Sequence, residues 1–265
     1  MNIEKVTIGA DPELFIIKIP GSVVSSIGLI PGVKNDPFIP KGFKKGYGVE
    51  TDNILAEFNI PPAKSEDEFA NSIALMKQWI DDFVRSKDAR YTIECTASRH
   101  VGYDQLQSDE ARQFGCDPDY NAYTEEVNPK PEGAATDLRS AGFHIHVGYP
   151  KQNYKTSVNI IKWMDAYLGV PSIILDRNIE RRQLYGKAGA FRLQPWGVEY
   201  RVLSSYMMNN DRLTRYVYRQ TMAAVSHADT VDEEMFKEAR DIINSNDIVG
   251  AQVFCKKYNI KTSLI

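Results

Sequence analysis

The sequence predicts an α+β protein in which several strands form one sheet and the carboxyl-terminal part, from about residue 207, is helical. Apolar and polar residues alternate in several separate stretches, which is typical of strands with one packed face. Elsewhere apolar residues recur at steps of three and four, which is typical of helices that cover a core. A chain of 265 residues forms one large domain or two small ones.

Composition and charge exclude several classes of function. The formal net charge is −3, so no basic field attracts nucleic acid or an anionic membrane. No apolar run approaches the ~20 residues of a membrane span, and the first residues lack a signal-peptide pattern. The cysteines Cys95, Cys116 and Cys255 have no zinc or redox spacing. We therefore expect a cytoplasmic protein with no nucleic acid or membrane partner.

Residues 6–19 predict a first strand that carries two acids. Asp11 and Glu13 flank Pro12, so both carboxylates lie on one face of the strand. The proline predicts that this is an edge strand or that the strand is interrupted there. Two carboxylates on one face repel each other unless a cation lies between them, although a solvated edge strand also carries such pairs.

Residues 51–60 predict a second acidic strand. Glu57 faces away from the apolar side chains, and Asp52 shares its side only if Asp52 lies in a bend or a bulge. Pro61 and Pro62 are expected to end this strand. The packed face consists of Ile54, Ala56, Phe58 and Ile60.

The segments that follow are expected to pack rather than to react. Ser65 and Glu68 form a capping box that opens a helix over residues 65–86. Residues 91–96 alternate as another strand. Residues 101–131 have no clear period and predict a long ordered loop, of a kind that often belongs to a binding site.

The stretch Gly-Phe-His-Ile-His-Val-Gly at residues 142–148 shows the strictest alternation in the chain. His144 and His146 point together to one face of the predicted strand, because side chains two apart share a face. The opposite, packed face consists of Phe143, Ile145 and Val147. A strand with two solvent-facing histidines is the ordinary interpretation, and only the acids elsewhere argue for a site.

Two further segments add basic residues. A helix is predicted over residues 156–168, broken or restarted by Pro171, and residues 185–192 then form a glycine-rich basic turn suited to anionic oxygens or simply solvated. Residues 196–203 alternate again, with Glu199 and Arg201 on one side. Such a pair is often only a surface ion pair. Helices are predicted over residues 211–227, 232–244 and 247–258.

The polar faces of these strands together predict a site for metal and phosphate. In one sheet they would present five carboxylates, two imidazoles and an arginine to one concavity. So many acids in one cleft raise each other's pKa unless cations bind. Carboxylates with a single imidazole per metal suit Mg²⁺ or Mn²⁺ better than zinc. Three arginines add contacts for phosphate oxygens, namely Arg139, Arg192 and Arg201.

Several of these motifs resemble those of the carboxylate–amine ligases, the superfamily of glutamine synthetase and glutamate–cysteine ligase. Within it, the chain is most similar to the phage-type amidoligases, or COOH-NH2 ligases of type 2. It shares their acidic first strand, their Asp-rich turn into Glu-Phe-Asn, and their Arg-Ser-Ala-Gly-Phe-His-Ile-His segment. The similar segments are residues 11–13, 52–59, 139–146, 185–192 and 199–205.

The resemblance implies a single catalytic domain over residues 1–265. Its curved antiparallel sheet would carry the site on the concave face, with helices packed outside, as in the catalytic domain of glutamine synthetase. ATP and Mg²⁺ (or Mn²⁺) would be the cofactors, and the substrates would be carboxylates and amines, either small molecules or peptides. The reaction would form an amide through an acyl phosphate, in the host cytoplasm if a phage encodes the protein.

The resemblance also implies roles for single residues. The metal ligands would be Asp11, Glu13, Asp52, Glu57, His144 and Glu199. The catalytic residues would be Arg201, Arg139 and His146, and the nucleotide would contact Arg192, Lys187 and Arg201. Asp11 stands where related ligases often carry glutamate, so its shorter side chain would reach the metal through water.

Two other functions fit the same residues. A metal-dependent hydrolase could use the acids and histidines on water, but it does not need the three arginines. A binding protein could keep the fold and lose turnover, because a metal site can be structural.

Overall fold

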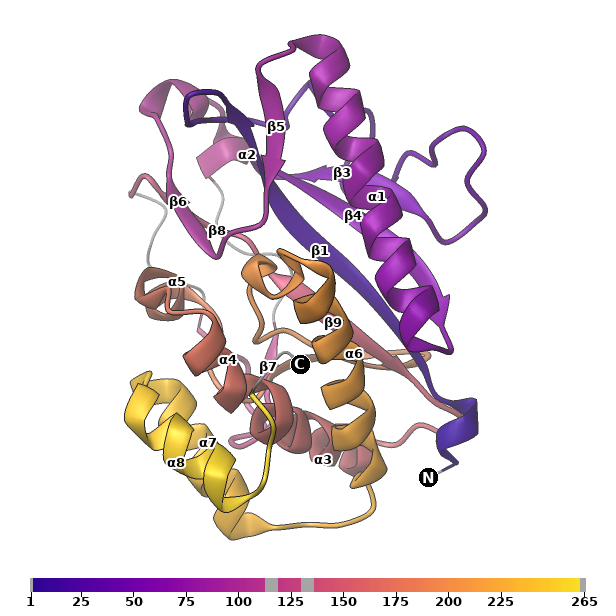
Figure 1. The fold of residues 1–265 in the computed structure, drawn as a ribbon, viewed down its shortest axis with the longest axis vertical. Helices are drawn as coiled ribbons and strands as arrows, with labels where there is room; N and C mark the ends of the chain where they lie inside the picture. Colours follow the sequence, from indigo (N-terminus) through magenta and orange to yellow (C-terminus); the bar gives the residue numbers. More distant parts are fainter. Residues whose placement is uncertain (1, 113–118, 130–135, 263–265) are drawn as a thin grey trace.

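The computed structural model describes residues 2–112, 119–129 and 136–262 (Figure 1). It is an α+β structure with a large antiparallel sheet, which confirms the predicted class. The strands are β1 (Thr7–Lys18), β2 (Ser22–Val24), β3 (Gly48–Asp52), β4 (Leu55–Ala63), β5 (Tyr91–Glu94), β6 (Ser98–His100), β7 (Tyr120–Asn121), β8 (Leu138–Ser140), β9 (Phe143–Gly148), β10 (Ala190–Gln194) and β11 (Gly197–Tyr200).

The helices lie between and after these strands. The α-helices are α1 (Glu66–Lys87), α2 (Asp109–Arg112), α3 (Tyr154–Met164), α4 (Val170–Leu175), α5 (Ile179–Leu184), α6 (Asp211–Ser226), α7 (Glu233–Ser245) and α8 (Ile248–Lys257). Short 3-10 segments are η1 (Ile3–Lys5), η2 (Tyr103–Gln105) and η4 (Ser205–Met208), and η3 (Asp165–Gly169) is a π-helical turn.

The large sheet has nine strands and is antiparallel throughout. Its main path runs β3-β4-β1-β9-β11-β10-β7, and β2 and β5 also pair with β1. The prediction of an edge strand at Pro12 is therefore wrong, because β1 is central. Pro12 lies opposite Phe143 at the last pair of the β1–β9 ladder, where a missing N–H interrupts the pairing least.

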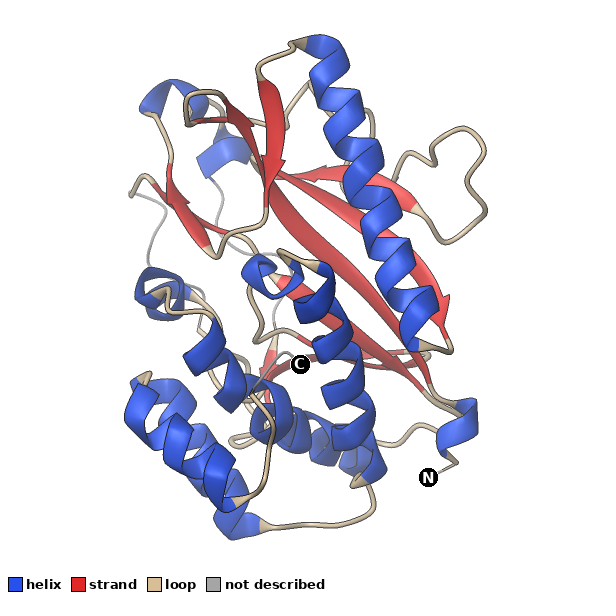
Figure 2. Cartoon of the chain, in the orientation of Figure 1, coloured by secondary structure: helices blue, strands red, loops and turns tan. Residues whose placement is uncertain are grey.

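Helices cover one face of this sheet (Figures 1 and 2). The long helix α1 lies along β1 and β4, and α6 packs beside α1. Ile8 and Leu14 of β1 face this layer and share the main core with Phe69 of α1. Asp11 and Glu13 alternate with these residues and so face away from the helices.

Most predicted helices are confirmed. The Ser65 hydroxyl caps α1 by accepting a hydrogen bond from the Glu68 N–H at 3.2 Å. The last three helices, α6 to α8, begin and end within two residues of the predicted bounds. These bounds were predictable because each helix begins at an Asn or Asp cap followed by a regular apolar stripe.

The predicted single strand over residues 51–60 is wrong, because the structure has a β-hairpin there. Asn53 takes a left-handed conformation with φ +55°, which turns the chain between β3 and β4. Pro61 and Pro62 do not end β4, which continues to Ala63. The pairing with β3 stops at Asn59, so one side of β4 is open at the two prolines and needs no donor.

Of the two outcomes predicted for Pro171, the break is absent and the restart is seen, because α4 begins at Val170 with Pro171 in its first turn. Helical structure runs from Tyr154 to Leu175, and the wider π-helical turn at Asp165–Gly169 precedes the proline. The N–H of Val170 reaches the carbonyl of Asp165, so the helix continues around the missing donor of Pro171. By length and composition this run resembles a membrane span, but 78% of its apolar window is buried within the fold, as in a core helix.

The glycine-rich segment 185–192 is also more ordered than expected. Its first part is a turn, with Gly186 and Gly189 both at positive φ, but its last residues form β10. β10 pairs with β11, so Arg192 lies directly opposite Glu199. The alternation in β10 is too short to stand out beside the three small residues in a row at Ala188–Ala190.

Candidate functional site

Polar side chains gather on the face of the large sheet that the helices leave open. Three cross-strand pairs lie on this face, namely Asp11 with His144, His146 with Glu199, and Glu13 with Glu57. Because side chains two positions apart share a face, segments far apart in the sequence meet here. All six residues predicted as metal ligands lie in two groups on this face.

The first group, here called the histidine cluster, consists of Asp11, His144 and Glu199. One ligand atom from each lies within 4.8 Å of the others. The Nδ1 atom of His144 is 3.5 Å from Asp11 Oδ1 and 3.8 Å from Glu199 Oε1. Glu199 is only 1% exposed, so its charge requires a partner.

The second group, here called the carboxylate cluster, consists of Glu13, Asp52 and Glu57, again within 4.8 Å. It exists only because the β3–β4 hairpin folds Asp52 back towards Glu57. The backbone N–H of Gly142 donates to Glu13 Oε2 at 2.6 Å, and Lys34 Nζ lies 3.1 Å from Asp52 Oδ1. One lysine therefore pairs with a cluster of three carboxylates.

In the histidine cluster the ionised acids are favoured. Burial alone would raise the pKa of Asp11, but His146 and His144 outweigh it and hold that pKa below its usual range. Burial and Asp11 act to raise the pKa of Glu199, but Arg201 and the two histidines lower it overall. Burial lowers the pKa of His146, yet Asp11 and Glu199 more than offset this, so it is raised.

In the carboxylate cluster the ionised acids are disfavoured. Burial raises the pKa of Glu57 well above its usual range, and the charges of Asp11, Asp52 and Glu13 add to this effect. Burial also raises the pKa of Glu13, against the opposing effect of His144. Carboxylates that repel each other in this way bind a cation in competition with protons.

The donor atoms fit a divalent cation that prefers oxygen. Asp11 Oδ1 and His146 Nε2 are both buried and 3.0 Å apart, yet neither has a well-aligned hydrogen bond among the described residues. Two carboxylates with one imidazole, and three carboxylates, are ligand sets for Mg²⁺ or Mn²⁺ rather than for a zinc site rich in cysteine or histidine.

Comparison with known families bears on the same segment. Residues 121–243, slightly less than half of the chain, match the family of phage phiEco32-like COOH.NH2 ligases, type 2. This part of the chain is similar to the phage-type amidoligases. The matched segment contains β9, β10 and β11, and hence the site residues His144, His146 and Glu199. Curated proteins yielded no match to the chain.

Two arginines of the matched segment, residues 121–243, lie at the histidine cluster. Arg201 is 8% exposed; its Nη1 donates to Glu199 Oε1 and lies 3.4 Å from His144 Nδ1. Arg192 Nη1 is 3.5 Å from the other Glu199 oxygen, and the Gln194 side-chain amide donates to that oxygen at 3.0 Å. Glu199 thus lies between the imidazole of His144 and the guanidinium groups of Arg201 and Arg192.

Arg139 and Lys187 are not brought to the two clusters. Arg139 lies in β8 of the separate two-stranded sheet, and its buried guanidinium donates to the carbonyls of Ala111, Thr136 and Leu138. These hydrogen bonds connect β8 to the backbone at Ala111, so Arg139 has a structural role. Lys187 is exposed in the turn before β10.

Gly142 is required where the histidine strand begins. A Cβ atom at this position would lie 2.6 Å from His144 Nε2, so any larger residue would push the imidazole out of place. The glycine N–H also holds Glu13, which belongs to the other cluster. Gly142 therefore contacts one side chain of each cluster.

Sequence reasoning missed Glu50 and Trp196. Glu50 of β3 lies opposite Glu57, is 9% exposed, and has an Oε2 atom without a hydrogen-bond partner in the described chain. Burial and the charges of Asp52 and Asp11 act to raise its pKa. Trp196, in the β10–β11 turn, has its ring 4.8 Å from that of His146. The signal for Glu50 was its position two residues before Asp52, because residues two apart share a face of an extended chain.

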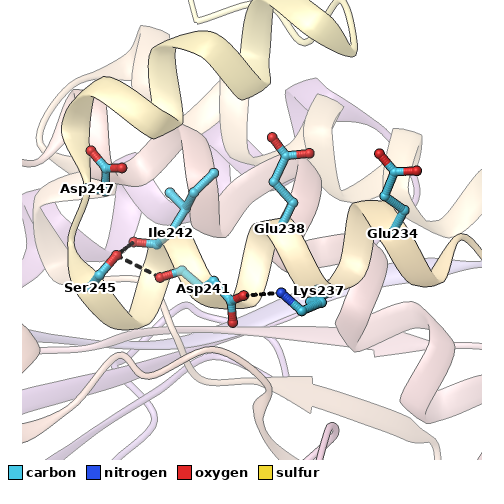
Figure 3. Close-up of a pocket in the computed structure, with 7 residues that line it drawn as sticks. All are labelled: Glu234, Lys237, Glu238, Asp241, Ile242, Ser245 and Asp247. Carbon is cyan, nitrogen blue, oxygen red and sulfur yellow. Dashed lines mark hydrogen bonds and ion pairs between the residues drawn. The ribbon is translucent and has the colours of Figure 1, made fainter.

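A pocket of about 320 Å³ lies away from these clusters, on the carboxyl-terminal helices (Figure 3). Three of its acids already have basic partners, because Lys237 pairs with Asp241 and Lys257 pairs with Glu234 and Glu238, and the fourth, Asp247, caps α8. None of the predicted site residues lines it, and we assign it no role. The lining residues are Glu234, Lys237, Glu238, Asp241, Ile242, Ser245 and Asp247.

Proposed function

We propose that this protein is an ATP-dependent carboxylate–amine ligase that requires Mg²⁺ or Mn²⁺ and forms an amide through an acyl phosphate. The observation that carries the proposal is the convergence of six ligand residues from five strands beside Arg201 and Arg192. The family match supports the ligase class. We also propose that the sheet is of the glutamine synthetase type.

The proposed metal sites are the two clusters. The histidine cluster and the carboxylate cluster would each hold one divalent cation, which supplies positive charge to the phosphate chain when bound. Without such charge the acids on this face would repel ATP. Glu199 orients Arg201 by accepting its Nη1 hydrogen bond, so that the rest of the planar guanidinium can serve phosphate oxygens.

In the proposed reaction, an oxygen of the substrate carboxylate attacks the γ-phosphorus of ATP, and ADP leaves. The amine nitrogen then attacks the acyl carbon, inorganic phosphate leaves, and the amine proton passes to solvent. Arg201 stabilises the charge on the equatorial oxygens of the phosphoryl group during the first step. Arg192 contacts the remaining phosphates. The substrates are carboxylates and amines of small molecules or peptides.

The test is a screen for ADP release with pairs of amino acids and peptides in the presence of MgCl₂. We expect ADP only when a carboxylate and an amine are present together, with an equal amount of amide. Glu199→Gln should abolish release, and Glu233→Gln, which changes an exposed acid at the start of α7, should not. Hydrolysis of an ester or peptide without any nucleotide would contradict the ligase and support a hydrolase.

A further inference from the structure

The π-helical turn η3 contains a completely buried acid, Asp165, on the helix side of the sheet. The hydroxyl of Tyr200 donates to its Oδ1 atom at 2.8 Å, and the backbone N–H of Gly189 donates to its Oδ2 atom at 2.7 Å. Tyr200 lies between Glu199 and Arg201 in the sequence and points to the opposite face of β11. One carboxylate therefore ties a helix to a strand and a turn.

The turn that Asp165 holds leads directly into β10. Gly189 has φ +76°, and a Cβ atom there would lie 2.7 Å from the ring of Tyr123, so the turn has little freedom to adjust. The next residues place Arg192 opposite Glu199. The two hydrogen bonds to Asp165 therefore hold the turn before β10, which leads to Arg192, and the end of β11, which leads to Arg201.

Burial of the Asp165 carboxylate is unfavourable for stability, although the carboxylate satisfies two buried donors. A fully buried carboxylate is disfavoured by desolvation, and burial raises the pKa of Asp165 to about 7 despite its hydrogen bonds. An apolar side chain that filled the same space would avoid this cost. π-helical turns are also frequent at functional sites, because the wider turn re-aims one side chain.

We propose that Asp165 is a positioning residue for the histidine cluster, which through Tyr200 and Gly189 holds β11 and the turn before β10 so that Glu199, Arg201 and Arg192 converge. This inference rests on the proposed function in that the cluster binds a metal. The hydrogen bonds of Asp165 go to Tyr200 and Gly189, and none joins it to the histidine cluster within the described part of the chain. It acts as a support, in the way that partners of metal ligands orient them.

The test compares two tyrosine variants by Mn²⁺ titration calorimetry without nucleotide, and by thermal melting. Tyr200→Phe removes the hydroxyl bound to Asp165. Tyr149→Phe is the matched control, because its buried hydroxyl bonds Ser157 of α3 at 2.7 Å. We expect similar losses of melting temperature, but a fall in the affinity of one class of Mn²⁺ sites of about 10-fold only for Tyr200→Phe.

Asp165→Asn and Asp165→Ala provide an independent check. Asparagine can accept from Gly189 and donate to Tyr200, so it should recover most of the Mn²⁺ affinity that alanine loses. Equal Mn²⁺ affinity in Tyr200→Phe and Tyr149→Phe, or in Asp165→Ala and wild type, would overturn the inference. Wild-type protein that binds no Mn²⁺ would instead contradict the proposed function, and the inference with it.

Discussion

Replacing Arg201 by lysine separates positive charge from guanidinium geometry at the centre of the proposed site. Arg201 donates to Glu199 and lies 3.4 Å from His144 Nδ1, and it is almost completely buried. Lysine keeps the charge that Glu199 requires, so the protein should remain folded. It offers a single nitrogen in place of a planar fork and cannot serve Glu199 and a phosphate oxygen in the same fixed geometry.

The expected loss follows from the role proposed for Arg201. Removing one preorganised stabiliser of charge in the transition state costs about 3 kcal/mol, which is a loss of about 100-fold in kcat. Because the contact strengthens as the phosphoryl group transfers, kcat and kcat/KM should fall together while KM for ATP changes little.

The assay is steady-state ADP release over a range of ATP at saturating Mg²⁺, with a substrate pair that supports turnover. Arg215→Lys is the control, because Arg215 forms ion pairs with Asp67 and Asp211 at the surface and should keep wild-type kinetics. A rise in KM with kcat intact would assign Arg201 to ground-state binding. Wild-type values for both constants would remove Arg201 from the site.

Three further predictions follow from single contacts. Gly142→Ala should weaken Mn²⁺ binding about 10-fold by displacing His144. In the control Gly9→Ala the new Cβ would lie 3.5 Å from His146 Cβ, an ordinary contact, so this variant should bind Mn²⁺ as wild type does. Equal Mn²⁺ binding by the two variants would refute the steric reasoning. Glu199→Gln should stop turnover and also cost about 3 kcal/mol of stability, because Arg201 loses its buried carboxylate; an unchanged urea midpoint would contradict this. Asp165→Asn should change the pH dependence of stability. The pKa of Asp165 is about 7 in the folded protein and 3.8 in the unfolded chain, so the folded protein binds this proton more tightly. As the pH rises from 3.8 to 7, wild-type stability should therefore fall by about 4 kcal/mol relative to the variant. Parallel stability profiles from urea melts would show that this pKa is not raised.

Most of the candidate site was predictable because side chains two positions apart lie on the same face of a β-strand. His144 and His146 share a face in any extended strand, and so do Glu199 and Arg201. The two acids of β1, Asp11 and Glu13, follow the same rule. The order of the strands brings these faces together, and the β3–β4 hairpin adds Asp52.

The rest depends on contacts that no short segment of the sequence contains. The hairpin at Asn53 rests on one left-handed residue within a run that alternates almost perfectly. Arg139 occurs beside the histidine motif but is held by carbonyls from other segments, such as that of Ala111. Asp165 resembles any polar residue of a helix until Tyr200 and Gly189 are folded against it.

The measurement that tests the central claim most directly is ATP binding by calorimetry, with and without Mg²⁺. If two clusters of acids on one sheet face bind the cations that hold the phosphate chain, ATP should bind in Mg²⁺ and lose at least 10-fold in affinity in EDTA. Glu57→Gln and His144→Ala, one from each cluster, should each weaken binding in Mg²⁺ without changing the weak binding in EDTA. Equal ATP affinity with and without the metal would contradict the proposed site.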